Sequence, residues 1–318
     1  MPKSIKPHPI DLSRVKRYPI DRRANKTEVR LFGKPIASLS GADFFQSLPK
    51  FLKANDLLDF IEAVYRARRR NKPFHLLIGA HTIKVGLSPL LIDLMKREIV
   101  TGISFNSAGV IHDLELAFFG GTSEDVQKGL DDGSFGMVEE TGELFASVAS
   151  LAAKHHTGLG EAAGMFIEKS KARHRSISIF ATAYNLGLAA TVHAGIGTDI
   201  VAQHPSFDGA QVGAASHTDF RLLAGVCEKI DRGGVVANIG SAVILPEVFL
   251  KALTVARNVH PGKSALTTAN FDMIVHYRPT ENVVRRPTHG AGKGYTFVGH
   301  HEIMVPLLAW GLRKRFKK

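Results

Sequence analysis

The 318-residue sequence contains a single cysteine, and this scarcity excludes two kinds of site. One thiol, Cys227, cannot form an intrachain disulfide and cannot build a cysteine-based zinc centre. Because Leu222, Leu223 and Val226 lie close to it in the chain, we expect Cys227 to be a small buried residue of a helix.

Long hydrophobic runs are also missing. No apolar stretch reaches the roughly 18–20 residues that a membrane-spanning helix needs. Residues 1–6 carry positive charge, but no apolar segment follows them, as a signal peptide would require. Hydrophobic residues make up 44% of the chain and charged residues 22%, which is ordinary for a globular protein. The sequence therefore predicts a soluble, cytoplasmic protein with no membrane partner.

Positive charge, by contrast, is in excess, because 41 basic residues against 29 acidic ones give a net charge of +12. The basic residues gather in three stretches, 1–34, 66–72 and 313–318. Such stretches can attract nucleic acid, but they contain few aromatic residues and match no nucleic-acid-binding motif. We interpret them as solvated helix ends and tails, so a nucleic-acid-associated protein is the weakest functional hypothesis.

Metal-site spacing is absent among the fifteen histidines. The adjacent pairs at 155–156 and 300–301 would point in different directions on a helix or a strand. No H-x-x-x-H or H-E-x-x-H pattern occurs, so we predict no metal. Four histidines follow predicted strands, and each is either a hydrogen-bonded structural residue or an acid–base group. They are His112, His193, His204 and His289.

Short apolar runs alternate with amphipathic segments after a proline- and charge-rich N-terminal arm at residues 1–40. We expect strands at 74–78, 99–105, 189–192, 234–240 and 264–269, and helices at 87–97, 177–186, 220–230 and 246–255. This alternation predicts an α/β fold over residues 41–318. The fold would be Rossmann-like and doubly wound, with a mostly parallel sheet covered by helices on both faces.

Small residues end several predicted strands, at 79–80, 107–109, 195–197 and 240–242. In doubly wound sheets, ligands bind outside the carboxyl ends of the strands, where small residues let backbone amides approach phosphates. The repeated pattern predicts a nucleotide-binding crevice. Neither the G-x-G-x-x-G fingerprint nor the G-x-x-x-x-G-K-[ST] loop is present, which disfavours a standard dehydrogenase or P-loop enzyme.

A series of motifs over residues 60–310 resembles the deoxyhypusine synthase family. In chain order they are GAHTIKVG at 79–86, NSAGVIHDL at 106–114, GIGTDI at 195–200, IGSAV at 239–243, TTANFD at 267–272, RPTE at 278–281 and MVPLL at 304–308. The resemblance implies an NAD-binding core and a homotetramer with active sites between paired subunits. It also implies oxidation of spermidine by NAD, an imine on an enzyme lysine, and transfer to an acceptor protein lysine.

The resemblance also assigns ligand contacts by position. The implied NAD contacts are Ala80, His81, Ser107, Ala108, Gly109, Gly240, Thr268 and Asp272, with Gly299 and His300 on the adenine side. Asp199 matches a carboxylate that grips the polyamine.

The chain departs from this family at the catalytic positions. His112 and Asp113 stand where the family has adjacent glutamates, which makes His112 the preferred acid–base candidate. The family's imine lysine aligns with residues 285–287, which are Arg-Arg-Pro here. The nearest lysine is Lys293, in a glycine-flanked segment expected to be a loop. Lys293 is either a catalytic lysine, which would need its charge suppressed, or an exposed lysine or phosphate contact.

The substrate is left open by the charges near the predicted site. A polyamine needs carboxylates to replace its hydration shell. The available ones are Asp113, Asp199, Glu247, Asp272 and Glu281. Arg285 and Arg286 would instead repel spermidine and suit a carboxylate or phosphate. An amine substrate different from the family's own is therefore as plausible as spermidine.

The leading hypothesis is an NAD-dependent transferase that oxidises a small amine to an imine, which a second amine captures. Asp113, Asp199 and Asp272 would hold the amine, His112 would move protons, and Lys293 would carry the imine. Without a lysine carrier, direct transfer to a free amine would give a homospermidine-like product. The alternative, from another class, is a paralogue that binds NAD but has lost catalysis and serves as a sensor or assembly protein.

Overall fold

A computed structural model of the protein describes residues 44–262 and 265–316. Residues 55–318 form one compact unit, which contains the whole sheet. The predicted arm at residues 1–40 lies outside the described residues. Among the residues described, no helix combines the length and apolar character needed to span a bilayer.

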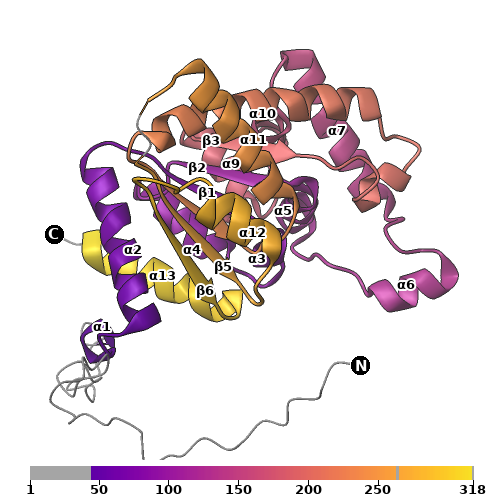
Figure 1. Ribbon diagram of the computed structural model, residues 1–318. Coiled ribbons are helices and arrows are strands. Elements are labelled where there is room, and N and C mark those ends of the chain that lie inside the picture. The colour runs from indigo at the N-terminus through magenta and orange to yellow at the C-terminus, as the bar shows by residue number, and fades with distance from the viewer. Residues whose placement is uncertain (1–43, 263–264, 317–318) are drawn as a thin grey trace, which may run out of the picture. The chain divides into compact units, whose positions relative to one another are not determined.

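The sheet has six strands, all parallel, in the order β3-β2-β1-β4-β5-β6 (Figure 1). The strands are β1 (Phe74–Ile78), β2 (Gly102–Asn106), β3 (Ala189–His193), β4 (Val235–Ile239), β5 (Thr267–Asp272) and β6 (Lys293–Val298). The strand order reverses between β1 and β4, which is the topological switch point of a doubly wound sheet. The predicted α/β fold is confirmed.

Helices cover both faces of this sheet. The helices that follow α1 (Phe44–Ser47) among the described residues are α2 (Leu52–Arg69), α3 (His81–Lys84), α4 (Ser88–Lys96), α5 (Ser107–Phe119), α6 (Val126–Asp132), α7 (Glu139–His155), α8 (Leu159–Lys169), α9 (Ile179–Asn185), α10 (Gly209–Asp231), α11 (Ile244–Val259), α12 (Tyr277–Pro279) and α13 (His301–Phe316). The remaining elements are the turns η4 (Arg175–Ile177) and η5 (Ile200–Gln203), and the π-helix η6 (Thr280–Arg285).

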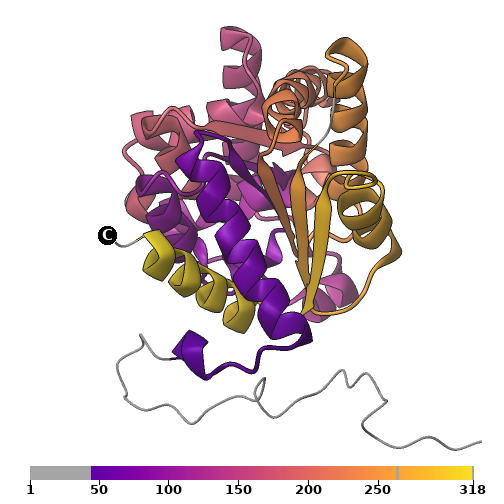
Figure 2. The same cartoon turned by 60° about the vertical axis from the view of Figure 1, so that its left-hand side comes forward.

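Alternate side chains of the central strands pack against different helices. Leu77 and Val236 join a core cluster with residues of α10 and α11. On the other face, Phe60 of α2 packs edge-on against Phe74 and Phe271. Figure 2 shows α2 and α13 side by side on that face, where an ion pair joins Glu62 to Arg315 at 2.7 Å. Both faces are therefore covered, which explains why every residue of β1 and β4 is buried.

A chain of polar side chains crosses the buried sheet from β1 to β3. His75 Nε2 lies 2.8 Å from Ser104 Oγ, which lies 2.6 Å from Thr191 Oγ1. Thr191 Oγ1 lies 3.0 Å from His193 Nε2. Burial lowers the pKa of His75 to about 3 and that of His193 to about 4. Both imidazoles are therefore neutral at physiological pH.

Asp219 is a second buried polar group and joins three elements. Its Oδ2 accepts hydrogen bonds from the backbone amides of Val192 in β3 (2.9 Å) and Gly160 in α8 (3.0 Å). Its Oδ1 makes no hydrogen bond with the described residues. Burial raises the pKa of Asp219 to about 7, against the opposing effect of the amide donors.

Three parts of the predicted element pattern were wrong. Residues 293–298 form strand β6 rather than a loop, and β5 runs to Asp272 instead of ending at residue 269. Helices α7 and α8 were not predicted. The prediction for Cys227 is confirmed, since the residue is fully buried in α10.

Candidate functional site

The carboxyl ends of β1 and β4 meet at the switch point without intervening side chains. A Cβ added to Gly79 would lie 2.1 Å from the carbonyl oxygen of Gly240, so only glycine fits there. Gly240 has φ +67°, and a Cβ on it would lie 2.7 Å from the His301 ring. The two strand-end glycines therefore let the backbones and His301 approach closely.

Polar atoms without partners are concentrated at this switch point. Asp272 ends β5 at the same edge, and its Oδ2 is buried without a hydrogen-bond partner among the described residues. Both ring nitrogens of His301, the first residue of α13, are also buried without a hydrogen-bond partner among the described residues. The His81 and His301 rings lie 5.6 Å apart between centroids. Burial lowers the pKa of His301, although nearby Asp272 acts in the opposite direction.

Buried polar atoms in native proteins nearly always have a partner, so this cluster fits a polar ligand that would supply one. A carboxylate oxygen and imidazole nitrogens are suited to hydroxyl groups such as those of a ribose. The sequence pattern did not single out His301. The signal was available, because His301 follows the predicted contact His300 and opens a long helix.

The structure brings most predicted NAD contacts to one edge of the sheet. Ala80 and His81 follow β1, and Gly240 follows β4. Asp272 ends β5, and Gly299 follows β6 and donates its amide to Asp272 O at 3.0 Å. The last of this group, His300, comes directly before α13.

Ser107, Ala108 and Gly109 open α5 at the end of the neighbouring strand β2, and thus belong to the same edge. Thr268 does not. It is the second residue of β5, in register with Val236, and is buried toward the amino end of the sheet. Thr268 is therefore not brought together with the other predicted contacts.

A cavity of about 450 Å³ lies at the end of β2, next to the start of α5. Its lining includes apolar residues and a group of charged or titratable ones. The latter are Lys84, His112, Glu115, Glu124 and Asp199. The structure thus places the predicted residues His112 and Asp199 in one cavity, together with Ala108. Glu115 and Lys84 were not predicted.

Asp199 is held at the cavity wall by the first residue of α5. The Ser107 hydroxyl donates a hydrogen bond to Asp199 Oδ2. Burial raises the pKa of the Asp199 carboxyl, although the bond from Ser107 opposes the rise. A cationic ligand in the cavity would favour the ionised form of Asp199.

Glu115 is the centre of a hydrogen-bonded group in the same cavity. The Thr141 hydroxyl donates to Oε1 at 2.8 Å, and the Thr122 hydroxyl donates to Oε2. Thr122 Oγ1 also lies 2.7 Å from His112 Nδ1, which is 3.6 Å from Glu115 Oε2. Burial alone would raise the pKa of Glu115, but the nearby His112 ring and the bonds from Thr122 and Thr141 outweigh it and lower the pKa. Glu115 is therefore an anion.

Asp113 has a different position from its neighbour His112. It is fully buried and accepts hydrogen bonds from Ser178 Oγ (2.5 Å) and the amides of Ile179 (2.9 Å) and Phe180 (3.2 Å). Burial raises the pKa of Asp113 to about 6 in spite of these donors. In this arrangement Asp113 holds the start of α9 and does not line the cavity.

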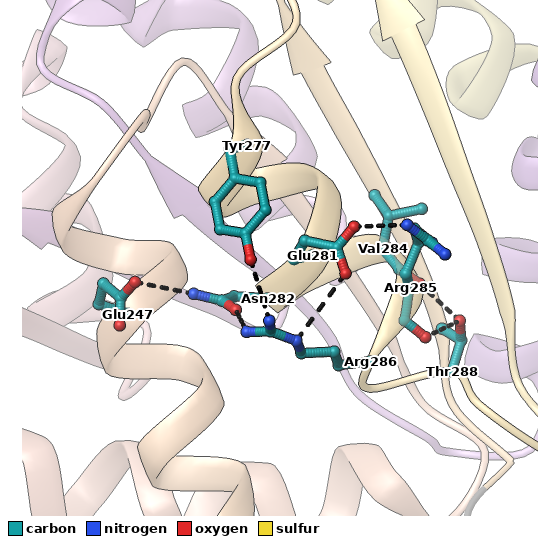
Figure 3. A network of polar contacts seen from close by, with 8 residues as sticks. All are labelled: Glu247, Tyr277, Glu281, Asn282, Val284, Arg285, Arg286 and Thr288. Carbon is teal, nitrogen blue, oxygen red and sulfur yellow. Dashed lines mark hydrogen bonds and ion pairs between the residues drawn. The ribbon is translucent and has the colours of Figure 1, made fainter. Parts of the chain in front are cut away.

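The two glutamates predicted to bind substrate lie in a network outside the cavity (Figure 3). Glu247 accepts from Asn282 Nδ2 at 2.8 Å and pairs with Lys251 and with Arg278. Figure 3 also shows Glu281 paired with both predicted arginines. The distances are 2.6 Å to Arg285 and 3.8 Å to Arg286. The arginine charges are thus compensated locally and do not enter the cavity.

Lys293 is not brought to this edge of the sheet. It begins β6, level with Thr267 at the amino end of β5, while the carboxyl ends form the opposite edge. Its exposed ammonium lies 2.9 Å from Asp59 Oδ2 and 4.9 Å from the centre of the Tyr295 ring. Contacts with Tyr295 and Asp59 raise the pKa of Lys293, whereas an imine-forming lysine needs a lowered one.

Comparisons with known proteins support the fold at low sequence identity. No protein-family model matches the chain, and no curated sequence is significantly similar to it. A Methanococcus maripaludis S2 protein, provisionally assigned as LOR/SDH, has a similar structure with a TM-score of 0.52 and 13% identity. The match covers 84% of this chain and 71% of that one.

Two further structures are similar over comparable lengths. AgrE, in a ternary complex with ornithine and NAD+, has a TM-score of 0.53 and 13% identity. That match covers 82% of this chain but 33% of AgrE, so this chain corresponds to a third of that protein. A provisionally assigned deoxyhypusine synthase from Entamoeba histolytica has a TM-score of 0.50 and 10% identity, over 84% of this chain and 90% of its own. These similarities establish a shared fold.

Proposed function

We propose that this protein is an NAD-dependent aminoalkyl transferase. It would oxidise a small amine to an imine, exchange the imine nitrogen for that of a second amine, and reduce the new imine. One hydride is removed and later returned, so the overall reaction transfers a carbon chain from one amine to another without net oxidation. The acceptor amine would be a small molecule or a protein lysine.

The observation that carries the proposal is the unpartnered polar cluster at the switch point beside an acidic cavity. Asp272 and His301 have buried polar atoms that a dinucleotide's hydroxyl groups would satisfy. Asp199 and Glu115 give the neighbouring cavity the negative charge that an ammonium group needs. Bound NAD would supply a reversible acceptor for the hydride.

The chain's own residues have separate tasks in this scheme. Asp199 would hold the ammonium end of the amine, and apolar residues such as Ile111 and Phe135 would contact its carbon chain. His112 would accept the proton that the amine must lose before a hydride can leave. Because Lys293 lies at the opposite edge, the proposed transfer proceeds directly to a free amine and needs no lysine carrier.

Two measurements test this proposal. Titration calorimetry should detect binding of NAD or NADH, and Asp272→Asn should weaken it about tenfold, since an amide nitrogen cannot accept the hydrogen bond that Oδ2 would. Asp59→Asn, which changes an exposed carboxylate on α2, is the matched control and should bind like the unaltered protein. Absence of heat with both nucleotides would contradict the proposal.

Turnover is tested with NAD and a panel of amines that includes spermidine, putrescine and ornithine, the last because AgrE binds it. We expect NADH absorbance and a new secondary amine in the mass spectrum. Borohydride trapping should leave no adduct on Lys293. An adduct that forms on the unaltered protein but not on Lys293→Ala would instead support Lys293 as the carrier of the imine.

Binding of NAD without turnover of any amine would favour the second candidate, a paralogue that retains the nucleotide site and acts as a sensor or assembly protein. The position of Lys293 is the observation that favours this candidate.

A further inference from the structure

We infer that Glu115 and Thr122 form a hydrogen-bonded triad with His112, which holds the imidazole with its proton on Nδ1 and leaves Nε2 free to take a proton. The inference rests on the proposed function for the identity of the proton donor, an amine in the cavity. The arrangement of protons in the triad follows from the contacts and from the charge of Glu115.

The first step is the charge of Glu115. Its two oxygens receive hydrogen bonds from Thr141 and Thr122, and these bonds favour the ionised form. An ionised carboxylate only accepts hydrogen bonds. The close contact between Thr122 Oγ1 and Glu115 Oε2 therefore requires the threonine proton to lie between these two oxygens.

The second step is the tautomer of His112. A threonine hydroxyl has one proton, and here Glu115 receives it. The 2.7 Å contact between Thr122 Oγ1 and His112 Nδ1 must then be a bond in which the imidazole donates. Neutral imidazole has one N–H, so Nε2 carries a lone pair. No described residue bonds to Nε2, and His112 lines the cavity.

The third step concerns where Thr122 comes from. It belongs to the segment that connects α5 to α7 through α6, whereas His112 and Glu115 lie one helical turn apart on α5. The segment begins at Gly120, with φ +75°, and is held at its far end by His204 Nε2, which lies 2.7 Å from Gly136 O. Figure 1 shows α6, in the middle of the segment, set apart from the sheet.

It follows that docking of this segment completes the base. With Thr122 in place, His112 is held in the tautomer that can accept a proton at Nε2. With Thr122 withdrawn, the nearest acceptor for Nδ1–H is Glu115 Oε2 at 3.6 Å, beyond normal hydrogen-bond distance. The same segment also lines the cavity, through residues such as Phe135 and Val138, so the base and the cavity wall are assembled together.

Nitrogen-15 NMR of the imidazole rings tests the triad in the protein without added ligand. His112→Gln assigns the His112 signals by their loss. At mildly alkaline pH we expect Nε2 to show the shift of an unprotonated nitrogen and Nδ1 that of N–H. Thr122→Val should shift the ring toward the Nε2–H tautomer, and Thr122→Ser should restore the original signals.

Thr141→Val is the matched control. It removes the other hydroxyl bond to the same carboxylate but leaves the contact to His112 intact, so the tautomer should not change. The inference is overturned if His112 carries its proton on Nε2 in the unaltered protein, or if Thr122→Val leaves the tautomer unchanged.

The NMR result does not depend on NAD binding or turnover. The triad can therefore be refuted while the proposed function stands, and the proposed function can be refuted while the triad stands. Where turnover is found, Thr122→Val should lower kcat about 100-fold, the lower end of the range for a general base, and clearly more than Thr141→Val does. Equal losses in the two variants would show that the threonines act only on the shape of the cavity.

Discussion

Replacement of Asp219 by asparagine should change how the free energy of unfolding depends on pH, and not only its value at a single pH. The carboxyl has a folded pKa of about 7 and an unfolded value of 3.8, so the folded state holds a proton that the unfolded state releases between these pH values. Its contribution is therefore fully present below about pH 4 and is lost as the pH rises through 7. At 1.36 kcal/mol per pH unit, the loss is about 4 kcal/mol.

The asparagine side chain cannot ionise, so this loss should disappear in the variant. Its amide oxygen can still accept from Val192 and Gly160, but its NH2 group replaces Oδ1, which has no described partner. A buried unpaired donor costs about 1–3 kcal/mol at every pH. Whatever the size of this constant cost, the unaltered protein should lose about 3 kcal/mol of stability relative to Asp219→Asn between pH 5 and pH 8.

Urea denaturation from pH 5 to pH 8 measures these curves. Only the difference between the two proteins is informative. His75 and His193 have lowered pKa values, so they make both proteins lose stability as the pH falls below their unfolded value. Asp208→Asn is the control, because Asp208 caps the same helix at an exposed site and asparagine caps equally well. Parallel curves for Asp219→Asn and the unaltered protein would refute the reasoning.

Three further substitutions have expected outcomes. Gly79→Ala would force a Cβ to within 2.1 Å of Gly240 O, and should cost about 1–3 kcal/mol in a urea titration and weaken NAD binding in calorimetry. Lys293→Ala removes an exposed ion pair with Asp59 and a contact with the Tyr295 ring, and should change the free energy of unfolding by about 1 kcal/mol or less. Ser104→Ala breaks the polar chain across β2, and should cost about 1–3 kcal/mol, measured in the same way, because the buried partners lose their hydrogen bonds.

The repeated pairing of apolar runs with small residues was enough to predict the parallel sheet and the edge where a ligand would bind. The predictions failed for residues whose location depends on where a strand begins or ends. The resemblance assigned Thr268 as an NAD contact, in keeping with a predicted fifth strand that ended at residue 269, whereas β5 continues to Asp272. Glycine-flanked Lys293 suggested a loop, but the following residues alternate in burial as an edge strand does.

Residues of the candidate site could be predicted only where they belong to a short motif or lie close in sequence to another residue of the site. His112 and Asp199 came from motifs, and Glu115 could have been found, because a spacing of three places it beside His112 on a helix. Thr122 could not have been found. It reaches His112 only because a glycine-hinged segment folds back, a contact between helix and loop that no periodicity encodes.

The row of hydrogen bonds from His75 to His193 links strands β1, β2 and β3, and it has a direction. Each of its two hydroxyls has one proton, so all three bonds must point the same way along the row. His75 Nδ1 has no described partner, and an orphaned N–H is rarer than an orphaned acceptor, so the row points from His75 to His193. A proton on His193 Nε2 would displace the hydrogen bond that Thr191 donates to it, so this end of the row should break only when the pH falls to about the His193 pKa of 4.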